Sequence, residues 1–139
     1  MPIPSQPINI EYKINMPLVT AAIIELYSNC GLPRPIDDEA RITEMFANSN
    51  LVISAWIDDE LVGISRSITD FVWSCYLADL AVRKDFQKFG IGRKLVEMTM
   101  EQLGETSMIL LLSVPDAMEY YPKIGMTKVE NGFILNRKR

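Results

Sequence analysis

Histidine is absent from this chain of 139 residues. Histidine is the one side chain whose unperturbed pKa places its charge change near neutral pH. Any acid–base group that works near neutral pH must therefore be a carboxylate, a perturbed lysine or cysteine, or water. The two cysteines, Cys30 and Cys75, have neither the spacing of metal ligands nor that of a disulfide framework. We therefore expect no metal site and a reducing, cytoplasmic environment.

Long apolar runs are also lacking, since no stretch of the sequence reaches 18 consecutive apolar residues. The first residues, MPIPSQPINIEYK, contain neither a basic segment nor the apolar core of a signal peptide. The sequence therefore predicts no membrane span and no secretion, and residues 1–6 are expected to be an irregular lead-in.

An excess of positive charge is missing as well. The chain has 14 Lys and Arg against 18 Asp and Glu, a net charge of −4 and a pI near 4.8. This balance argues against nucleic acid as a main partner. A hydrophobic content of 48% with 23% charged residues is ordinary for a globular protein. The length predicts a single domain, residues 1–139, that buries about two-thirds of its unfolded surface.

The most informative stretch of the sequence runs from Cys75 to Leu103. Residues 75–82 form a short, almost wholly apolar run that is typical of a buried strand. Residues 83–89 form a charged turn, and residues 90–103 place apolar side chains at helical spacing. The sequence therefore predicts a strand, a turn and a helix in direct succession.

The turn contains a pair of glycines, Gly90 and Gly92, at the start of the predicted helix. Glycine lets the backbone approach a ligand closely, and the first N–H groups of a helix have no partner within the helix. These groups lie at the positive end of the helix dipole, so the turn is suited to binding phosphate. It is neither a Walker loop, because Arg93-Lys94 follows Gly92, nor a Rossmann loop, because Leu95 replaces the third glycine.

With the strand before it and the helix after it, the segment from Gln87 to Gly92 resembles motif A of the GNAT acetyltransferase superfamily, Gln/Arg-x-x-Gly-x-Gly/Ala. The resemblance implies that acetyl-coenzyme A is bound here as a co-substrate. Backbone N–H groups of the turn would hold its pyrophosphate, while backbone groups of the strand would hold its pantetheine arm. The cofactor-binding residues implied in this way are Leu80, Ala81, Val82, Gln87, Lys88, Phe89, Gly90, Ile91, Gly92 and Arg93.

A second segment, from Ala117 to Met126, resembles the GNAT motif Ala-x-x-Phe-Tyr-x-Lys-x-Gly-Phe. The family places a tyrosine near the sulfur of coenzyme A, and that position is Tyr121 here. A phenol can protonate the thiolate that leaves when an amine displaces a thioester. Tyr120 is expected to pack as the family's Phe does. The chain departs from the family at Val114, where an Asn is frequent, and at Met126, which replaces the final Phe.

Asp79 lies inside the apolar run of residues 75–82. A buried carboxylate needs a partner, an opening to solvent or a raised pKa. One hypothesis makes Asp79 the base, or an anchor for the incoming amine, although related enzymes often carry their acid one residue earlier, where Ala78 stands. The alternative is a structural hydrogen bond to a backbone N–H or to Arg66.

The acceptor side is less defined by the sequence. By resemblance it would be formed by the first two helices, their loop and the strands before motif A. Acidic and aromatic groups in those segments would suit an amine, although acidic residues that open a helix are more often dipole-stabilising charges. The candidates are Tyr27, Arg34, Asp37, Asp38, Phe71, Trp73 and Tyr76.

The remaining sequence predicts an α/β domain of mixed α+β type with a mostly antiparallel sheet flanked by helices. Its order is β-α-α-β-β-β-α-β-α-β-β, which is the order of GNAT domains. Strands are expected at 8–14, 51–57, 61–67, 75–82 and 108–114, and helices at 17–29, 37–48, 90–103 and 116–124. A last hairpin is predicted at 127–130 and 133–136 around Asn131-Gly132.

The resemblance predicts an N-acetyltransferase that moves an acetyl group from acetyl-coenzyme A to a primary amine of a small molecule by direct attack in a ternary complex. The alternative is an acyl-coenzyme A binding or sensing module, or a non-catalytic subunit, with a degenerate acceptor site. Dimers are common in the family, so a homodimer is compatible with this interpretation.

Overall fold

The computed structural model describes residues 8–139, so the predicted lead-in at residues 1–6 lies outside the described residues. The described chain forms one five-stranded sheet in the order β1-β2-β3-β4-β5. The first four strands pair antiparallel, and β5 pairs parallel with β4. The mixed, mostly antiparallel sheet is therefore confirmed. Its strands are β1 (Glu11–Ile14), β2 (Leu51–Ile57), β3 (Glu60–Thr69), β4 (Ser74–Val82) and β5 (Met108–Leu110).

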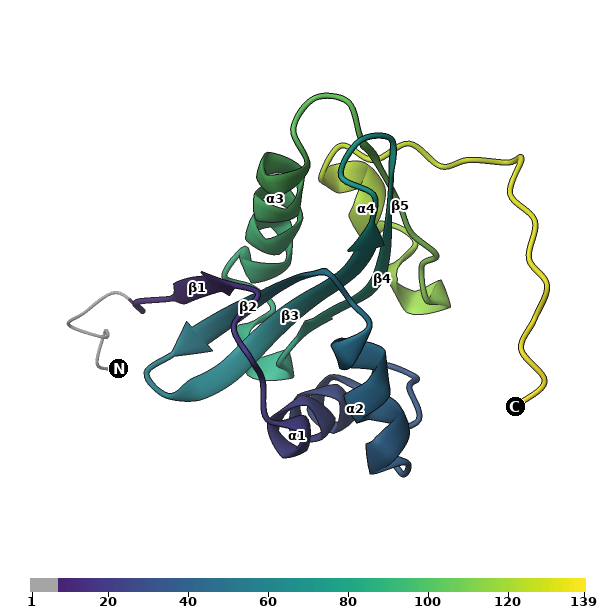
Figure 1. Cartoon of the computed structure of the whole chain (residues 1–139). Coiled ribbons are helices and arrows are strands. Elements are labelled where there is room, and N and C mark those ends of the chain that lie inside the picture. Colours follow the sequence, from purple (N-terminus) through teal and green to yellow (C-terminus); the bar gives the residue numbers. More distant parts are fainter. Residues whose placement is uncertain (1–7) are drawn as a thin grey trace.

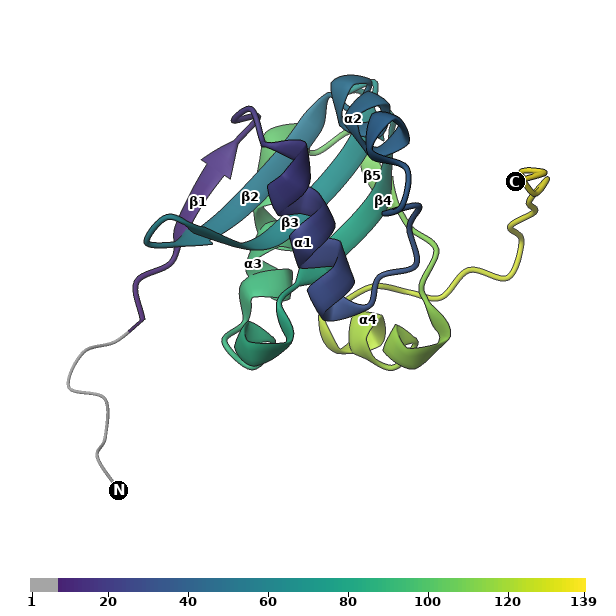
Figure 2. The same ribbon diagram turned by 90° about the horizontal axis from the view of Figure 1, so that it is seen from below.

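Helices cover both faces of this sheet. Helices α1 (Thr20–Cys30) and α2 (Glu39–Ala47) lie on one face, and α3 (Ile91–Leu103) lies on the other (Figure 1). Seen from below, α1 crosses the sheet diagonally over β3 (Figure 2). Three short helical turns complete the structure: η1 (Lys84–Phe86), η2 (Pro115–Ala117) and α4 (Tyr120–Lys123). Within residues 8–139, no helix combines the length and the apolar character needed to cross a bilayer.

Two apolar cores lie against the two faces. On the α1 side, Leu26 and Ile42 pack with Ile64 of β3. On the α3 side, Leu95 packs with Ile53 and Val62. Side chains alternate between the two faces along each strand, so the same strands supply both cores. Val62 departs from this alternation relative to Ile64, because it is an extra residue where the pairing of β2 with β3 shifts between Ala55 and Trp56.

A shift in strand register directs side chains from the two ends of β4 to opposite faces of the sheet. Arg66 pairs with Asp79, but the next residue of β3 pairs with Leu77, so Ala78 is an extra residue in β4. Such a bulge re-aims the side chains that follow it. Cys75 accordingly packs on the α3 side, whereas Asp79 lies on the α1 side, where it meets Tyr27. The bulge thus turns an acidic residue of an apolar strand toward the first helix.

The sequence-based prediction is wrong at the C-terminal end. Strand β5 ends at Leu110 rather than at 114, the helix predicted at 116–124 is divided into η2 and α4, and residues 127–139 form no strand. A two-stranded hairpin without packing is at best marginal in water. Here Phe133 and Leu135 are fully exposed, so the alternating pattern has no surface to pack on. The other predicted elements are present, with ends displaced by no more than three residues.

Candidate active site

The site begins where β4 and β5 stop pairing. Their parallel ladder runs only from Ser74 to Tyr76 on β4, opposite Met108 to Leu110. Strand β4 continues to Val82, paired with β3 alone among the described strands. One backbone edge of residues 77–82, which include Leu80, Ala81 and Val82, therefore has no strand beside it in residues 8–139. A free edge of this kind can take an extended ligand as it would take another strand.

This free edge leads directly into the glycine turn. The η1 turn and the N–H group of Phe89, which donates to the Phe86 carbonyl, reverse the chain before α3. The Gln87 side-chain amide reaches back to the carbonyl of Val82 at 3.0 Å. Gln87 thus ties the turn to the end of β4. The first residue of the predicted motif consequently has a structural role that the sequence pattern did not reveal.

Gly90 is the N-cap of α3 and has a φ angle of 74°. Only glycine adopts this left-handed conformation without strain. The next three residues, Ile91, Gly92 and Arg93, open the helix, so their N–H groups have no acceptor within it. The turn therefore presents a row of free donors at the positive end of α3, as phosphate binding requires.

Gly92 is needed for a different reason. A Cβ atom at this position would lie 2.7 Å from the hydroxyl of Tyr120. The backbone at the start of α3 is therefore approached closely by the phenol of α4, and the two predicted motifs meet in space. An open groove of about 490 Å³ adjoins the turn. It is lined by Ile8, Asn9, Ile10, Tyr12, Phe89, Gly90, Arg93, Lys94 and Glu97.

The chemistry of the donor set fits a bound phosphoanhydride. Gly90 keeps side-chain atoms away from the helix start, and nothing lies within 4 Å of the place its Cβ would occupy. Arg93 and Lys94 supply positive charge on the first turn of α3, and Arg93 is shared with Glu97, 3.3 Å away. Lys88 and Phe89 precede the glycine, and Phe89 is about half exposed. The residues expected from the sequence thus lie together around one helix N-terminus.

Tyr121 is the second residue of α4 and is half-buried. Burial raises the pKa of its phenol, the neighbouring Tyr120 raises it further, and the charge of Arg34 opposes both. The two tyrosine rings meet edge to face, with centroids 5.2 Å apart. A phenol with a raised pKa stays protonated at neutral pH, so Tyr121 is able to donate a proton.

Both oxygens of the Asp79 carboxylate accept hydrogen bonds from neighbouring side chains. Its Oδ1 accepts from Arg34 Nε at 2.6 Å, and its Oδ2 accepts from Arg66 Nε at 2.6 Å and from the Tyr27 hydroxyl at 2.8 Å. The residue is 1% exposed. Burial by itself would raise the pKa of this carboxyl, but the hydrogen bonds and charges of Arg66 and Arg34 hold it below its usual range. We name these four residues the Asp79 cluster.

These contacts bear on the hypothesis that Asp79 is a base. A carboxylate with a lowered pKa and two charged donors is a poor proton acceptor. The geometry favours the alternative drawn from the sequence, a structural bond to Arg66, and adds Arg34 and Tyr27 to it. The sequence offered a signal for this pairing, because Arg66 and Asp79 are charges of opposite sign within adjacent apolar strands.

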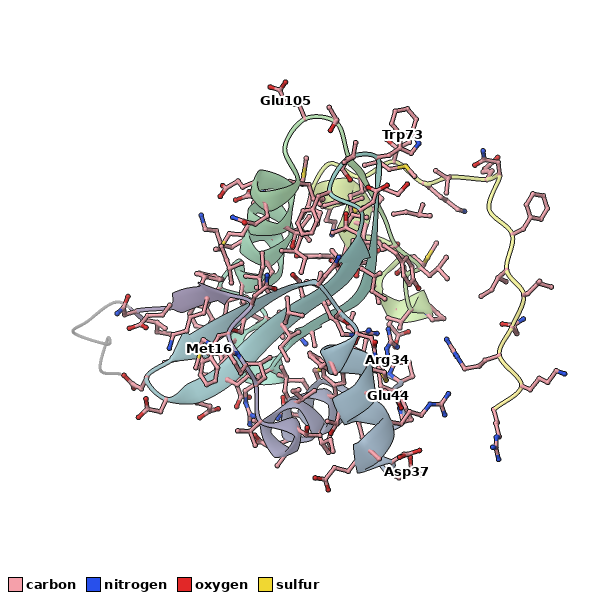
Figure 3. The ribbon with its side chains drawn as sticks, viewed as in Figure 1. Met16, Arg34, Asp37, Glu44, Trp73 and Glu105 are labelled. Atoms are coloured by element: carbon pink, nitrogen blue, oxygen red, sulfur yellow. The ribbon has the colours of Figure 1, made fainter. Side chains whose placement is uncertain are left out.

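Arg34 ties the loop after α1 to β4 (Figure 3). Besides Asp79, its guanidinium donates to the carbonyl of Ala78 at 2.7 Å and to that of Pro33 at 2.7 Å. The side chain is 21% exposed and its charge reaches Tyr121. Arg34 therefore connects the cluster with the phenol.

The other candidates for the acceptor side are dispersed. Tyr27 is fully buried in the Asp79 cluster. Asp38 is the N-cap of α2 and accepts from the Arg41 N–H, and Asp37 precedes it. Phe71 and Trp73 are exposed in the connection between β3 and β4, and Tyr76 is exposed on β4. The structure does not bring these side chains together around one pocket.

Among residues 8–139, no three His, Cys, Asp or Glu side chains are grouped as metal ligands would be. Both cysteines are free thiols. Burial raises the pKa of the Cys75 thiol, and the nearby hydroxyls of Ser67 and Thr69 oppose that shift.

Comparison with known proteins gives a consistent result. An uncharacterized N-acetyltransferase of Pyropia yezoensis, ycf52, is 31% identical over 91 residues, which are 61% of this chain and 52% of that protein. The chain spans about half the length of the curated relatives that it matches.

Solved structures share the fold. A protein of unknown function from meticillin-resistant Staphylococcus aureus, described as a probable acetyltransferase, matches with a TM-score of 0.79 and 20% identity, covering 93% of this chain and 100% of that one. The aminoglycoside N-acetyltransferase AAC(6')-Iy, solved with CoA, matches with a TM-score of 0.72 and 12% identity, covering 99% and 100%.

The model of the acetyltransferase (GNAT) family matches residues 20–126, a range that includes both motifs, the free edge of β4 and the Asp79 cluster. This range is more than half of the chain, and its match agrees with the architecture described above. The chain belongs to the acetyltransferase (GNAT) family.

Proposed function

We propose that the chain is an N-acetyltransferase that moves the acetyl group of acetyl-coenzyme A to a primary amine of a small molecule. The observation that carries this proposal is the continuity of two binding elements. The free edge of β4 at residues 77–82 ends where the glycine turn begins. A ligand with an extended arm and a pyrophosphate would meet strand-like backbone groups first and helix N–H groups next.

In this proposal the cofactor-binding residues fall into two groups. Backbone groups of Leu80, Ala81 and Val82 receive the arm, and the turn receives the phosphates. The turn contributes the free N–H groups of α3, and Lys88 and Arg93 add charge-assisted contacts. Acetyl-coenzyme A supplies the activated acyl group, a thioester whose carbonyl carbon is open to attack by an amine.

Tyr121 is the proposed general acid. The amine nitrogen bonds to the carbonyl carbon, the bond from carbon to sulfur breaks, and the phenol gives its proton to the departing sulfur. The phenolate that remains is stabilised by Arg34, whose charge opposes the raised pKa of Tyr121. Solvent then returns a proton to the phenol. The products are an amide and a free thiol.

Asp79 is proposed as a positioning residue rather than as the base. Each of its oxygens already accepts a hydrogen bond from a guanidinium. It holds Arg34 beside β4, and Arg34 in turn acts on Tyr121. The proton that the amine loses would pass to water, since the chain has no histidine and the described residues offer no free carboxylate in the Asp79 cluster.

The test combines binding with turnover. Purified protein is titrated with acetyl-coenzyme A by calorimetry, and thiol release is then followed against a library of small amines. We expect saturable binding and thiol release with a subset of the amines. Binding without release across the library would favour the sensing module instead. Absence of binding would overturn the assignment of the glycine turn.

A matched pair of glycine variants locates the phosphate site. Gly90→Glu places a side chain and a negative charge at the start of α3 and should abolish binding of acetyl-coenzyme A. Gly104→Glu is the control, because Gly104 also has a φ angle of 74° and empty space around it, but it lies at the other end of α3. Equal loss of binding in both variants would show an effect of backbone strain alone.

A further inference from the structure

The Asp79 cluster contains more positive charge than negative charge. The guanidiniums of Arg34 and Arg66 both pair with the one carboxylate of Asp79, which leaves a net charge of +1. The fourth member is neutral, because burial and the charge of Asp79 raise the pKa of the Tyr27 phenol well above its usual value. In the described chain, neither guanidinium forms an ion pair with a second carboxylate. One positive charge of the cluster is therefore left without a counter-charge.

This excess charge is most accessible at Arg34. The Arg66 side chain is 9% exposed, and its guanidinium lies 5.6 Å from the centre of the Phe46 ring, whose π face attracts cations. The Arg34 side chain is 21% exposed. A guanidinium has five N–H groups, and Arg34 donates three hydrogen bonds, to Asp79 and to the carbonyls of Pro33 and Ala78. The remaining N–H groups have no acceptor among residues 8–139, so they can bind an anionic group of a ligand.

Arg34 also lies close to the place where acetyl transfer is proposed. With the pyrophosphate at the start of α3, the thioester would lie toward the beginning of the free edge of β4, near Ala78. The carbonyl of Ala78 accepts from Arg34 at 2.7 Å. The charge of Arg34 reaches the phenol of Tyr121, the proposed acid. An anion bound by Arg34 would therefore lie beside the reacting carbon.

An apolar surface continues from the cluster on the same face of the sheet. Ile68, Tyr76 and Leu110 are direct neighbours across β3, β4 and β5, so their side chains share one face. Cys75 packs on the α3 side, so Tyr76 beside it points to the α1 side, which is also the side of Asp79. The three side chains are 47%, 39% and 40% exposed. We call Ile68, Tyr76 and Leu110 the apolar row.

We propose that the acceptor is an α-amino acid with an apolar side chain. Arg34 binds its carboxylate, the apolar row receives its side chain, and its amine faces the acyl carbon near Ala78. The amine nitrogen bonds to that carbon, the bond from carbon to sulfur breaks, Tyr121 protonates the sulfur, and the amine loses its proton to water. The products are an N-acetyl amino acid and free coenzyme A. This inference rests on the proposed function and names the class of its acceptor.

Charge favours this class over a polyamine. The carboxylate of the amino acid would neutralise the excess charge at Arg34. The positive charge of the cluster would also lower the pKa of a nearby ammonium group, which favours the neutral amine that attacks. A polyamine would place its further charges near two guanidiniums, and both oxygens of Asp79 already accept from them.

The first test compares small amines as acceptors for acetyl-coenzyme A. Leucine and isoamylamine have the same side chain, but only leucine has a carboxylate. We expect kcat/KM for thiol release to be higher for leucine by about 10-fold or more. Leucine should exceed glycine by about 10-fold as well, because glycine has no side chain for the apolar row. Release with isoamylamine or spermidine that equals or exceeds release with leucine would overturn the inference and leave the proposed function standing.

Arg34→Gln tests the source of this preference. The carboxylate of leucine also changes the basicity of its amine, so the ratio of kcat/KM for leucine to that for isoamylamine is compared between the variant and wild type. The ratio should fall by about 10-fold or more, because only leucine has the group that Arg34 binds. An equal loss for both amines would limit Arg34 to a structural role and refute the inference.

A pair of charge variants on the apolar row leaves Arg34 intact. Leu110→Glu and Leu110→Lys remove the same apolar side chain, which is 40% exposed, and differ in the charge that replaces it. The KM for leucine should be higher in Leu110→Glu than in Leu110→Lys by about threefold or more, because the new carboxylate repels that of leucine. Isoamylamine should show the opposite order. Equal KM values for leucine in the two variants would contradict a carboxylate bound beside this row.

A binding measurement separates this inference from the proposed function. An NMR titration of the protein with leucine, and then with isoamylamine, requires no acetyl transfer. Leucine binding without thiol release would support the carboxylate site and refute the transferase. Thiol release with other amines, without leucine binding, would refute the carboxylate site and support the transferase. The absence of both would overturn both.

Discussion

The Asp79 cluster and the phenol of Tyr121 both feel the charge of Arg34, but they differ in burial and in hydrogen bonding. Asp79 is 1% exposed and accepts from two guanidiniums and a tyrosine. Tyr121 is half-buried, and its hydroxyl has no hydrogen-bond partner among residues 8–139. A group with every site filled can stabilise the fold, whereas a group with a free site can act on a ligand.

The direction of each pKa shift expresses this difference. Burial pushes the pKa of Asp79 up, and the two arginines more than reverse that effect, so its charged form is favoured. Burial also pushes the pKa of Tyr121 up, but there Arg34 opposes the shift without reversing it, so its neutral form is favoured. Asp79 therefore stays ionised beside Arg34 and Arg66, and Tyr121 stays protonated and can donate its proton.

Removing the carboxylate should produce the largest effect. Asp79→Ala leaves Arg66 as a buried charge without its partner, and breaking such a pair costs about 3–5 kcal/mol. We expect the free energy of unfolding, measured with urea, to fall by that amount. Asp59→Ala, in the exposed turn between β2 and β3, should change it by less than about 0.5 kcal/mol. A loss no greater than that of this control would show that the cluster does not hold the fold together.

Removing the hydroxyl of Tyr121 should affect catalysis rather than stability. Tyr121→Phe should lower kcat by about 100-fold, the lower end for a lost general acid, with little change in stability. Tyr120→Phe is the matched control on the adjacent residue, because we assign that tyrosine to packing. Its kcat should stay within a few-fold of wild type. Equal kcat for Tyr121→Phe and wild type, measured on an amine that the wild type acetylates, would refute the acid role.

Lowering the pH should also weaken the Asp79 cluster, and it should reduce the free energy of unfolding by less than Asp79→Ala does. The folded-state pKa of Asp79 is lowered, so its stabilisation is present above the unfolded value of about 3.9 and is lost as the pH falls through the folded pKa. We expect the free energy of unfolding of wild type to decline in that acidic range. Asp79→Asn should start lower and show a shallower decline. Parallel declines in the two proteins would assign the acid sensitivity to other carboxyls.

The sequence predicts the glycine turn better than it predicts the Asp79 cluster, for a physical reason. Residues 75–103 make their structure locally: an apolar run, two glycines and a helical repeat lie in one continuous segment. The cluster joins Tyr27, Arg34, Arg66 and Asp79 from four separate segments, through a bulge at Ala78. The sequence shows two buried charges of opposite sign, but it does not show a bulge that decides which face Asp79 meets.

At the C-terminal end, the local sequence pattern predicts structure that the chain does not form. Residues 127–136 have the alternation and the Asn-Gly pair of a hairpin, yet the described chain forms no strand there. Local pattern specifies which residues can share a face but supplies no edge to pair with.

The smallest expected effect concerns the contact of Gly92 with Tyr120. In Gly92→Ala the new Cβ would lie 2.7 Å from the Tyr120 hydroxyl and 3.5 Å from the ring carbon that bears it. Alanine is favoured over glycine in a helix by about 0.5–1 kcal/mol, but the clash offsets that gain. Adding Tyr120→Phe removes the hydroxyl, so the double variant should recover the helix gain. A double-mutant cycle of unfolding free energies should then show a coupling of about 0.5–1.5 kcal/mol. If the unfolding free energies of the two substitutions are additive, the Tyr120 hydroxyl does not pack against the backbone at Gly92. The assignment of Tyr120 to packing would then be wrong.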